Sequence, residues 1–133
     1  MFETKTVIKL HDTDAAGITF FANHFRIAHT AYEAFMKSIG AGLDEMIRNA
    51  EHFVLIAHAE ADYERPLFHG QTVSISLEAE SIGNSSFVLA YEFKTDEGEV
   101  AARVKTVHVT IDKDSGDKVA VPKPIFDGLK SLG

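Results

Sequence analysis

The sequence predicts an α+β domain in which an antiparallel sheet wraps around one long helix. The chain has 133 residues, 45% of them hydrophobic, which suits a single domain over residues 1–133 with a core of its own. It contains one long run of apolar residues at helical spacing, and most of the chain after residue 52 alternates between apolar and polar side chains, as strands do. Because a sheet with one buried face needs a partner layer, the long helix is expected to cover it.

The first part of the chain predicts a strand, a junction and two helices. Residues 3–10 alternate as in a strand, and a stretch rich in aspartate, alanine and glycine comes next. The helical pattern starts near Asn23, which is suited to capping a helix, and its apolar positions recur every three or four residues. It covers about 17 residues, or about 25 Å at ~1.5 Å per residue, and stops at Gly40. A shorter helix is expected over residues 43–50.

The second part of the chain is expected to be mostly strand. Turn signals such as Gly83-Asn84 and Asp96-Glu97-Gly98 separate its alternating runs, and a short helix is expected over residues 125–132. We expect four strands in an antiparallel meander, over residues 52–63, 72–82, 86–94 and 100–112. A long antiparallel sheet that curls around one helix is the architecture known as the hotdog fold.

Charge and composition exclude several classes of function. The chain has 13 basic and 20 acidic residues, a net charge of −7, and no basic stripe, so nucleic acid is not an expected partner. The absence of cysteine excludes disulfides, thiolate metal sites and cysteine nucleophiles, and it suits a cytoplasmic location. No apolar run approaches the ~18 residues of a membrane helix, and the first residues lack a signal-peptide pattern. The seven histidines show no ligand spacing, so no metal site is expected.

The junction between the first strand and the long helix is the expected functional site. Asp12 and Asp14 lie there among small residues, where backbone or a ligand can approach closely. The start of a helix offers unpaired amide N–H groups and the positive end of the helix dipole. A carboxylate beside such donors suits acyl chemistry, because the acid acts on a carbonyl or a water while the amides hold the oxyanion. Aspartates at such junctions also serve as turn and capping residues, and spacing alone leaves both roles open.

The motif Asp12-Thr13-Asp14-Ala15-Ala16-Gly17, with Phe20-Phe21-Ala22-Asn23 behind it, resembles the signature of the 4-hydroxybenzoyl-CoA thioesterase family of hotdog proteins. The likeness extends to further segments, which resemble the branch that hydrolyses 1,4-dihydroxy-2-naphthoyl-CoA in menaquinone or phylloquinone biosynthesis: 29–33, 55–63, 65–67 and 107–109. The resemblance implies an acyl-CoA thioesterase with Asp14 as nucleophile or general base. It implies that the backbone amide of Phe21 polarises the thioester carbonyl, and it leaves Asp12 as a support. No cofactor is implied beyond the coenzyme A of substrate and product.

The resemblance also implies binding residues and an assembly. The acyl group is expected to contact four residues: Gly17, Phe20, His24 and Phe53. Core packing is the alternative role for at least two of the rings at Phe20, Phe21, His24 and Phe53. The turn over residues 81–87 lacks the basic run of the family's founding enzyme. The coenzyme A phosphates are therefore expected to be held by solvent, by Arg103 or Lys105, or by a neighbouring subunit. Hotdog sheets pair edge to edge, so a homodimer or homotetramer is expected.

Several alternatives stay open at this point. A broad-specificity thioesterase for short or medium acyl chains would carry the same motif. A hotdog hydratase needs a paired histidine and carboxylate, which Asp14 and His24 imitate at a different spacing. An acyl-binding subunit without activity would not need Asp14, and an acidic carrier protein in place of coenzyme A would be repelled by the net charge of −7. Glu33, at a helix position that is catalytic in another hotdog lineage, is expected at the surface or an interface.

Overall fold

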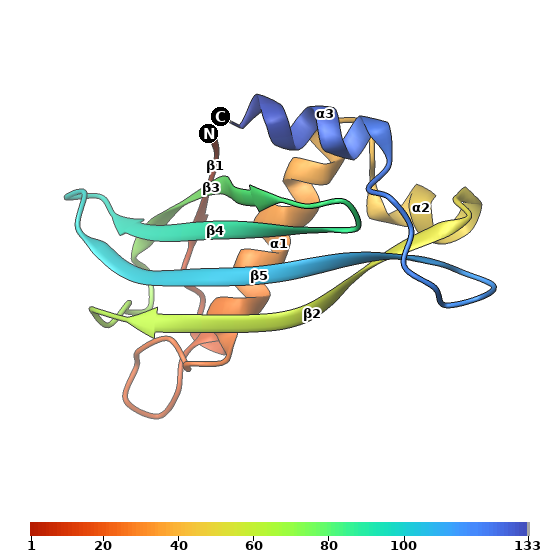
Figure 1. The fold of residues 1–133 in the computed structure, drawn as a ribbon. Coiled ribbons are helices and arrows are strands. Elements are labelled where there is room, and N and C mark those ends of the chain that lie inside the picture. Colours follow the sequence, from red (N-terminus) through yellow and green to blue (C-terminus); the bar gives the residue numbers. More distant parts are fainter. Residues whose placement is uncertain (133) are drawn as a thin grey trace.

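The computed structural model describes residues 1–132, which form one five-stranded antiparallel sheet and three helices (Figure 1). The strands are β1 (Phe2–Val7), β2 (His52–Tyr63), β3 (Thr72–Ile82), β4 (Ser86–Thr95) and β5 (Val100–Asp112). The helices are α1 (Asn23–Ser38), α2 (Leu43–Asn49) and α3 (Lys123–Ser131), and a 3₁₀ turn, η1, covers Leu10–Asp12. The predicted α+β class with an antiparallel sheet is confirmed.

Helix α1 is the longest helix of the described chain and lies against one face of the sheet (Figure 1). Its 16 residues repeat apolar side chains at helical spacing, so one face of the helix can be buried continuously. The buried positions of α1 are His24, Ile27, Ala28, Ala31, Tyr32, Phe35 and Met36. The core therefore sits between this helix and the sheet, and it fixes where the first turn of α1 lies.

The predicted meander is correct for β3, β4 and β5 but wrong for β2. The strand order is β1-β3-β4-β5-β2, so β2 pairs with β5 at one edge and β1 pairs with β3 at the other. Strand β5 is long enough to pair with all of β2, from Tyr63 opposite Ala102 to His52 opposite Asp112. The chain after β2 must then cross the end of the sheet to reach β3, and this crossing segment, residues 64–71, borders the motif loop.

Two boundaries at the start of the chain differ from the prediction. Strand β1 ends at Val7, because the next residue bonds the crossing segment: the Ile8 amide donates to Gln71 and the Ile8 carbonyl accepts from Gly70. Asn23 begins α1 as predicted but does not cap it, since Ala22 occupies the capping position. The Asn23 side chain donates instead to the backbone carbonyl of Asp12, over 2.8 Å.

The inner face of β5 is unexpectedly polar. Its side chains Thr106, His108 and Thr110 are buried, while the apolar neighbours between them lie on the outer face. His108 stacks on the ring of Phe87 at 4.8 Å, and its Nε2 lies 2.7 Å from the Thr106 hydroxyl. The Thr106 hydroxyl in turn lies 2.9 Å from that of Tyr91. Burial lowers the pKa of His108 to about 4, and the neighbouring His29 contributes to the shift.

The buried His108 predicts a loss of stability between pH 6.5 and about 4. The imidazole titrates at 6.5 in the unfolded chain but stays neutral down to about 4 in the folded one, so the unfolded state binds more protons in this window. The free energy of unfolding should therefore decrease as the pH is lowered from 6.5 to about 4, by up to about 3 kcal/mol from the titration of His108. Urea unfolding across this pH range measures the slope.

The matched variants for this measurement are His108→Phe, which keeps a ring against Phe87, and His69→Phe at an exposed site. Carboxylates titrate equally in all three proteins, so the comparison isolates His108. The slope should flatten in His108→Phe alone. Equal slopes in the three proteins would show that His108 does not cause the pH dependence.

Candidate active site

A cavity of about 530 Å³ opens where the motif loop, the first turn of α1 and the crossing segment meet. It brings together four residues predicted from the sequence: Asp14, Phe20, Phe21 and His24. The facing wall is formed by the end of β2 and the residues after it, including Tyr63, Arg65 and Leu67. The two walls are joined by backbone hydrogen bonding, since the Thr19 amide donates to the Leu67 carbonyl over 2.8 Å.

The motif loop is a tight hairpin that presents Asp14. The Asp14 amide donates to the Ile18 carbonyl at 2.9 Å, and the Gly17 amide donates to the Asp14 carbonyl at 3.0 Å. Gly17 has a φ of +79°, which a side chain would disfavour, so this turn needs glycine. Gly17 does not line the cavity in this chain; its role here is to close the loop.

Asp14 is exposed at the cavity with one carboxylate oxygen uncommitted. Its Oδ1 accepts the Ala16 amide at 2.8 Å, which holds the side chain in an Asx turn. Within residues 1–132 the second oxygen, Oδ2, has no hydrogen-bond partner. The carboxylate is thus oriented through one oxygen, and the other is available to a substrate or a water.

Asp12 has the supporting role that the motif predicts. The residue is only 3% exposed, and its Oδ2 accepts the Lys9 amide at 2.8 Å while Oδ1 binds the guanidinium of Arg26. Its backbone carbonyl accepts from the Phe20 amide at 2.9 Å and from the Asn23 side chain at 2.8 Å. A single residue therefore ties the end of the first strand to the motif loop and to the first turns of α1.

The backbone of Phe21 lies at the start of α1, where amide groups have no helical partner. Its amide donates no hydrogen bond within the described chain, so it is available as a donor at the positive end of the helix dipole. Its carbonyl is held from two sides, by the Tyr63 hydroxyl at 2.8 Å and by Nδ1 of His24 at 3.1 Å. The backbone at Phe21 is thus fixed by side chains from β2 and α1.

His24 is buried beside this carbonyl, with only 4% of its surface exposed. The ring packs edge-on against Tyr63, with centroids 4.7 Å apart, and lies 5.7 Å from the ring of Phe93. Burial lowers the pKa of His24, while the hydrogen bond to the Phe21 carbonyl and the nearby backbone of Phe20 oppose the shift. The imidazole is therefore neutral at neutral pH.

The aromatic side chains at the cavity leave large surfaces uncovered. Phe21 is 61% exposed and Phe20 is 43% exposed, and their ring centroids are 4.7 Å apart. Tyr63 ends the 55–63 segment of the family resemblance but was not among the predicted site residues, and it is also exposed. Uncovered rings around a cavity in which the Asp14 carboxylate has no cationic partner within the described chain, while that of Glu64 is paired with Arg103, suit a flat apolar ligand that carries a reactive polar group.

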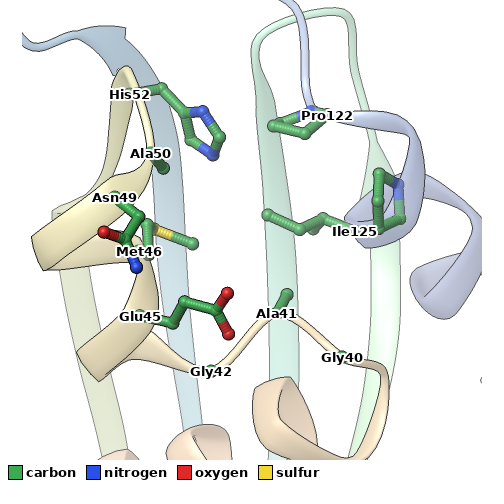
Figure 2. Close-up of a pocket in the computed structure, with 11 residues that line it drawn as sticks. Gly40, Ala41, Gly42, Glu45, Met46, Asn49, Ala50, His52, Pro122 and Ile125 are labelled. Carbon is green, nitrogen blue, oxygen red and sulfur yellow. The ribbon is translucent and has the colours of Figure 1, made fainter.

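Phe53 lies near the start of β2 and Tyr63 at its end, so the two residues are about 33 Å apart at ~3.3 Å per residue. It is not part of the cavity within one chain, and the Lys113 ammonium lies 4.9 Å from its ring. Its neighbour His52 borders a second cavity, of about 300 Å³, between α2 and the segment that enters α3. Figure 2 shows His52, Met46 and Ile125 around that cavity, which contains none of the predicted site residues.

The two basic residues expected at the coenzyme A phosphates do not line the candidate site. Arg103 pairs with Glu64 and Glu92, and Lys105 pairs with Glu80 at 2.7 Å. Arg65 is the basic residue in the cavity wall, where it pairs with Glu99 at 2.9 Å. The sequence showed Arg65 next to a proline after a strand, but only the crossing of the chain brings it to the cavity that Asp14 also lines.

The described part of the chain has neither a cluster of metal ligands nor a membrane-spanning helix. Within residues 1–132, no group of three histidine, aspartate or glutamate side chains is placed to hold a metal ion. No helix of that part of the chain is long and apolar enough to cross a membrane.

The sequence and the fold of this chain are similar to those of known proteins. The profile of the thioesterase-like superfamily matches residues 8–129. The 1,4-dihydroxy-2-naphthoyl-CoA hydrolase of Gloeothece citriformis is 39% identical, over 94% of this chain and 89% of its own, and that of Rippkaea orientalis is 33% identical, over 93% and 91%. The crystal structure of a 1,4-dihydroxy-2-naphthoyl-CoA thioesterase from Synechocystis superposes with a TM-score of 0.93 at 26% identity, covering 98% of this chain and 96% of that one.

The contacts of Asp12 predict that Asp12→Ala destabilises the fold by about 2 kcal/mol, because the Lys9 amide and the Arg26 guanidinium lose a buried charged acceptor. Urea denaturation measures the loss. The matched control is Asp44→Ala on α2, where an exposed carboxylate pairs with Arg48 at 3.5 Å and should contribute less than about 0.5 kcal/mol. Similar losses in both variants would contradict the supporting role of Asp12.

Proposed function

This chain belongs to the thioesterase-like superfamily, and we propose that it is an acyl-CoA thioesterase that hydrolyses an aromatic substrate, 1,4-dihydroxy-2-naphthoyl-CoA, in quinone biosynthesis. The observation that carries the proposal is that one cavity is lined by both Asp14, whose carboxylate has an uncommitted oxygen, and Phe21, whose amide has no partner within the described chain. The relatives named above act on this substrate according to their names. A cytoplasmic location is part of the same proposal.

The Phe21 amide would stabilise the charge that forms during hydrolysis. When the thioester carbon is attacked, its carbonyl oxygen becomes an oxyanion, and a fixed amide N–H stabilises that oxyanion more than the neutral carbonyl. The amide lies at the positive end of α1. Because Tyr63 and His24 hold the Phe21 carbonyl, the backbone there needs little rearrangement during the reaction.

Asp14 would start the reaction through its uncommitted oxygen. As a general base, it takes a proton from a water that attacks the thioester carbon; as a nucleophile, it forms an anhydride that water then hydrolyses. In both routes the carbon–sulfur bond breaks, the sulfur leaves with a proton as coenzyme A thiol, and the acyl group leaves as a carboxylate. No redox step is needed.

The cavity wall also suggests how the rest of the substrate is held. The rings of Phe20, Phe21 and Tyr63 would contact the flat acyl group. Arg65 is the basic residue in the wall, and we propose that it moves from Glu99 to a phosphate of coenzyme A. No cofactor other than the coenzyme A of the substrate enters this proposal.

We propose that two copies pair through β2, which is an uncovered sheet edge. Its middle residues 55–60 are exposed, and Leu55 and Ile56 are 47% and 44% exposed. An open apolar edge of this length invites antiparallel pairing with a second copy. If the antiparallel pairing is centred on residues 55–60, Phe53 of the second copy would lie opposite Asp62 of the first. It would then be next to Tyr63 in the cavity wall of the first copy. Phe53 would then reach the acyl group from across the interface.

A tetramer would need a second surface. The outer face of the sheet carries apolar side chains that share one side in the strand register: Leu55, Val88, Val107 and Val109. Two dimers that pack through this patch would bury it. Pairing of two copies through β2 leaves this patch exposed, so the contact within the dimer and the contact between dimers use different surfaces.

The proposal predicts that Asp14→Asn lowers kcat for thioester hydrolysis by at least about 100-fold, because the amide is no base or nucleophile. Asparagine keeps an oxygen for the Ala16 amide, so the unfolding midpoint should not change. Asp96→Asn, at an exposed hairpin turn, is the control and should retain full activity. The measurement is thiol release from coenzyme A thioesters, and unchanged release in Asp14→Asn would remove Asp14 from the mechanism.

The same assay tests the substrate over a panel of aromatic and aliphatic acyl-CoAs. A preference for medium aliphatic chains would reject the aromatic substrate and leave a thioesterase. With crotonyl-CoA, loss of the double bond without thiol release would identify a hydratase. Absence of reaction throughout would favour a binding subunit.

Pairing through β2 predicts that Ala57→Pro yields monomers with reduced activity. Ala57 sits at a bulge on the open edge, where proline can be accommodated but cannot donate a hydrogen bond to a second copy. Ala57→Ser keeps the amide and is the matched control. Light scattering after gel filtration gives the mass, and thiol release gives the activity. A wild-type monomer with full activity would contradict the shared interface.

A further inference from the structure

The hydrogen bond between His24 and the Phe21 carbonyl determines which nitrogen of the imidazole carries the proton. A carbonyl oxygen only accepts, so Nδ1, which lies 3.1 Å from it, must be the donor. The ring is neutral because it is buried between α1, Tyr63 and Phe93. A neutral imidazole with its proton on Nδ1 has an unprotonated Nε2, which is a hydrogen-bond acceptor.

Nε2 of His24 is an uncommitted acceptor at the cavity. Within residues 1–132 it has no hydrogen-bond partner. It is also not one of the polar atoms that are sealed from solvent without a partner, which are in Tyr32, His108 and Thr110. Since His24 lines the cavity, a bound ligand can reach this nitrogen.

The other polar side chains of the wall are already engaged. The Thr19 hydroxyl donates to the Leu67 carbonyl at 3.1 Å, and the Tyr63 hydroxyl donates to the Phe21 carbonyl. Glu64 is paired with Arg103. The Thr19 and Tyr63 hydroxyls keep lone pairs that can accept, but each already makes a hydrogen bond. Among the lining residues, Nε2 of His24 is the neutral side-chain acceptor that makes no hydrogen bond within residues 1–132, and it stands beside the carboxylate of Asp14 that the proposed reaction uses.

We propose that Nε2 of His24 accepts a hydrogen bond from a hydroxyl group on the aromatic acyl moiety and thereby selects hydroxylated aromatic acyl thioesters. The inference rests on the proposed thioesterase function and assigns its specificity to one atom. An acyl group without a hydroxyl would leave this acceptor desolvated and unpaired. A single neutral hydrogen bond of this kind corresponds to about a 3- to 10-fold preference in kcat/KM.

The tautomer is tested first, without any substrate. Nitrogen NMR of the wild-type protein labelled with ¹⁵N-histidine, assigned with His24→Asn, should show the His24 proton on Nδ1 and a bare Nε2. A proton on Nε2 would make that nitrogen a donor and overturn the proposal.

The selectivity is tested with a matched variant and matched substrates. His24→Asn places a side-chain amide near the position of Nδ1, so the bond to Phe21 is retained while the Nε2 acceptor is lost. His29→Asn, on the same helix outside the cavity, is the control. The substrates are 2-naphthoyl-CoA and its 1-hydroxy and 4-hydroxy derivatives. Because the hydroxyl also changes the intrinsic reactivity, the quantity compared is the hydroxylated-to-plain ratio of kcat/KM in each protein.

This ratio should fall by about 3- to 10-fold in His24→Asn for at least one hydroxylated substrate, mainly through KM, and should stay unchanged in His29→Asn. An equal loss on all three substrates would assign His24 to chemistry or packing and overturn the selectivity. Unchanged ratios would overturn it as well.

If the wild type hydrolyses none of the three thioesters, the proposed function fails, and binding then decides the inference separately. Calorimetry with 2-naphthoate and its hydroxylated derivatives should show tighter binding of a hydroxylated acid in the wild type and no such difference in His24→Asn. Equal affinities, or no binding of any acid, would overturn the role of His24.

Discussion

The buried carboxylate of Asp12 and the guanidinium of Arg26 form the interaction on which the candidate site depends. Arg26 lies on the first turns of α1, so this pair fixes the helix to the strand end that precedes the motif loop. The backbone of Asp12 adds bonds to Phe20 and Asn23, on either side of the unpaired amide. Because the Asp12 carboxylate is buried while Arg26 is half-exposed, loss of Arg26 would leave a buried charge without its cation. The junction therefore has one favoured geometry, and Asp14 and Phe21 are placed by it.

The two aspartates of the motif therefore divide their roles through their surroundings. Asp12 is buried and fully engaged, whereas Asp14 is exposed and held through one oxygen. The same division occurs at Phe21, whose carbonyl is held by two side chains while its amide has no partner within the described chain. In both places one group is fixed so that a neighbouring group stays available, which is the arrangement that a preorganised site requires.

The apolar side chains that the sheet exposes favour assembly with other copies through its outer face and its open edge. Polar side chains of β5 face α1 and form a buried network around His108, while Val107 and Val109 point outward. The open edge of β2 adds exposed apolar residues next to this outer face. A chain with its apolar surplus on an edge and an outer face is suited to pairing with copies of itself.

Local patterns in the sequence were sufficient to predict α1, the strands and the place of the motif, because helical and strand periodicities and the small residues around Asp14 act over short distances. The resemblance carried by Asp14 and its neighbours also identified the family, which the profile match confirms. What the tertiary structure alone decided involves residues far apart in the chain. Pairing of β2 with β5 sends residues 64–71 across the sheet end. This brings Tyr63 to Phe21 and places Arg65 in the cavity that Asp14 lines, while Phe53 lies far from that cavity. Strand order depends on which long edges find each other, and no local pattern encodes that choice.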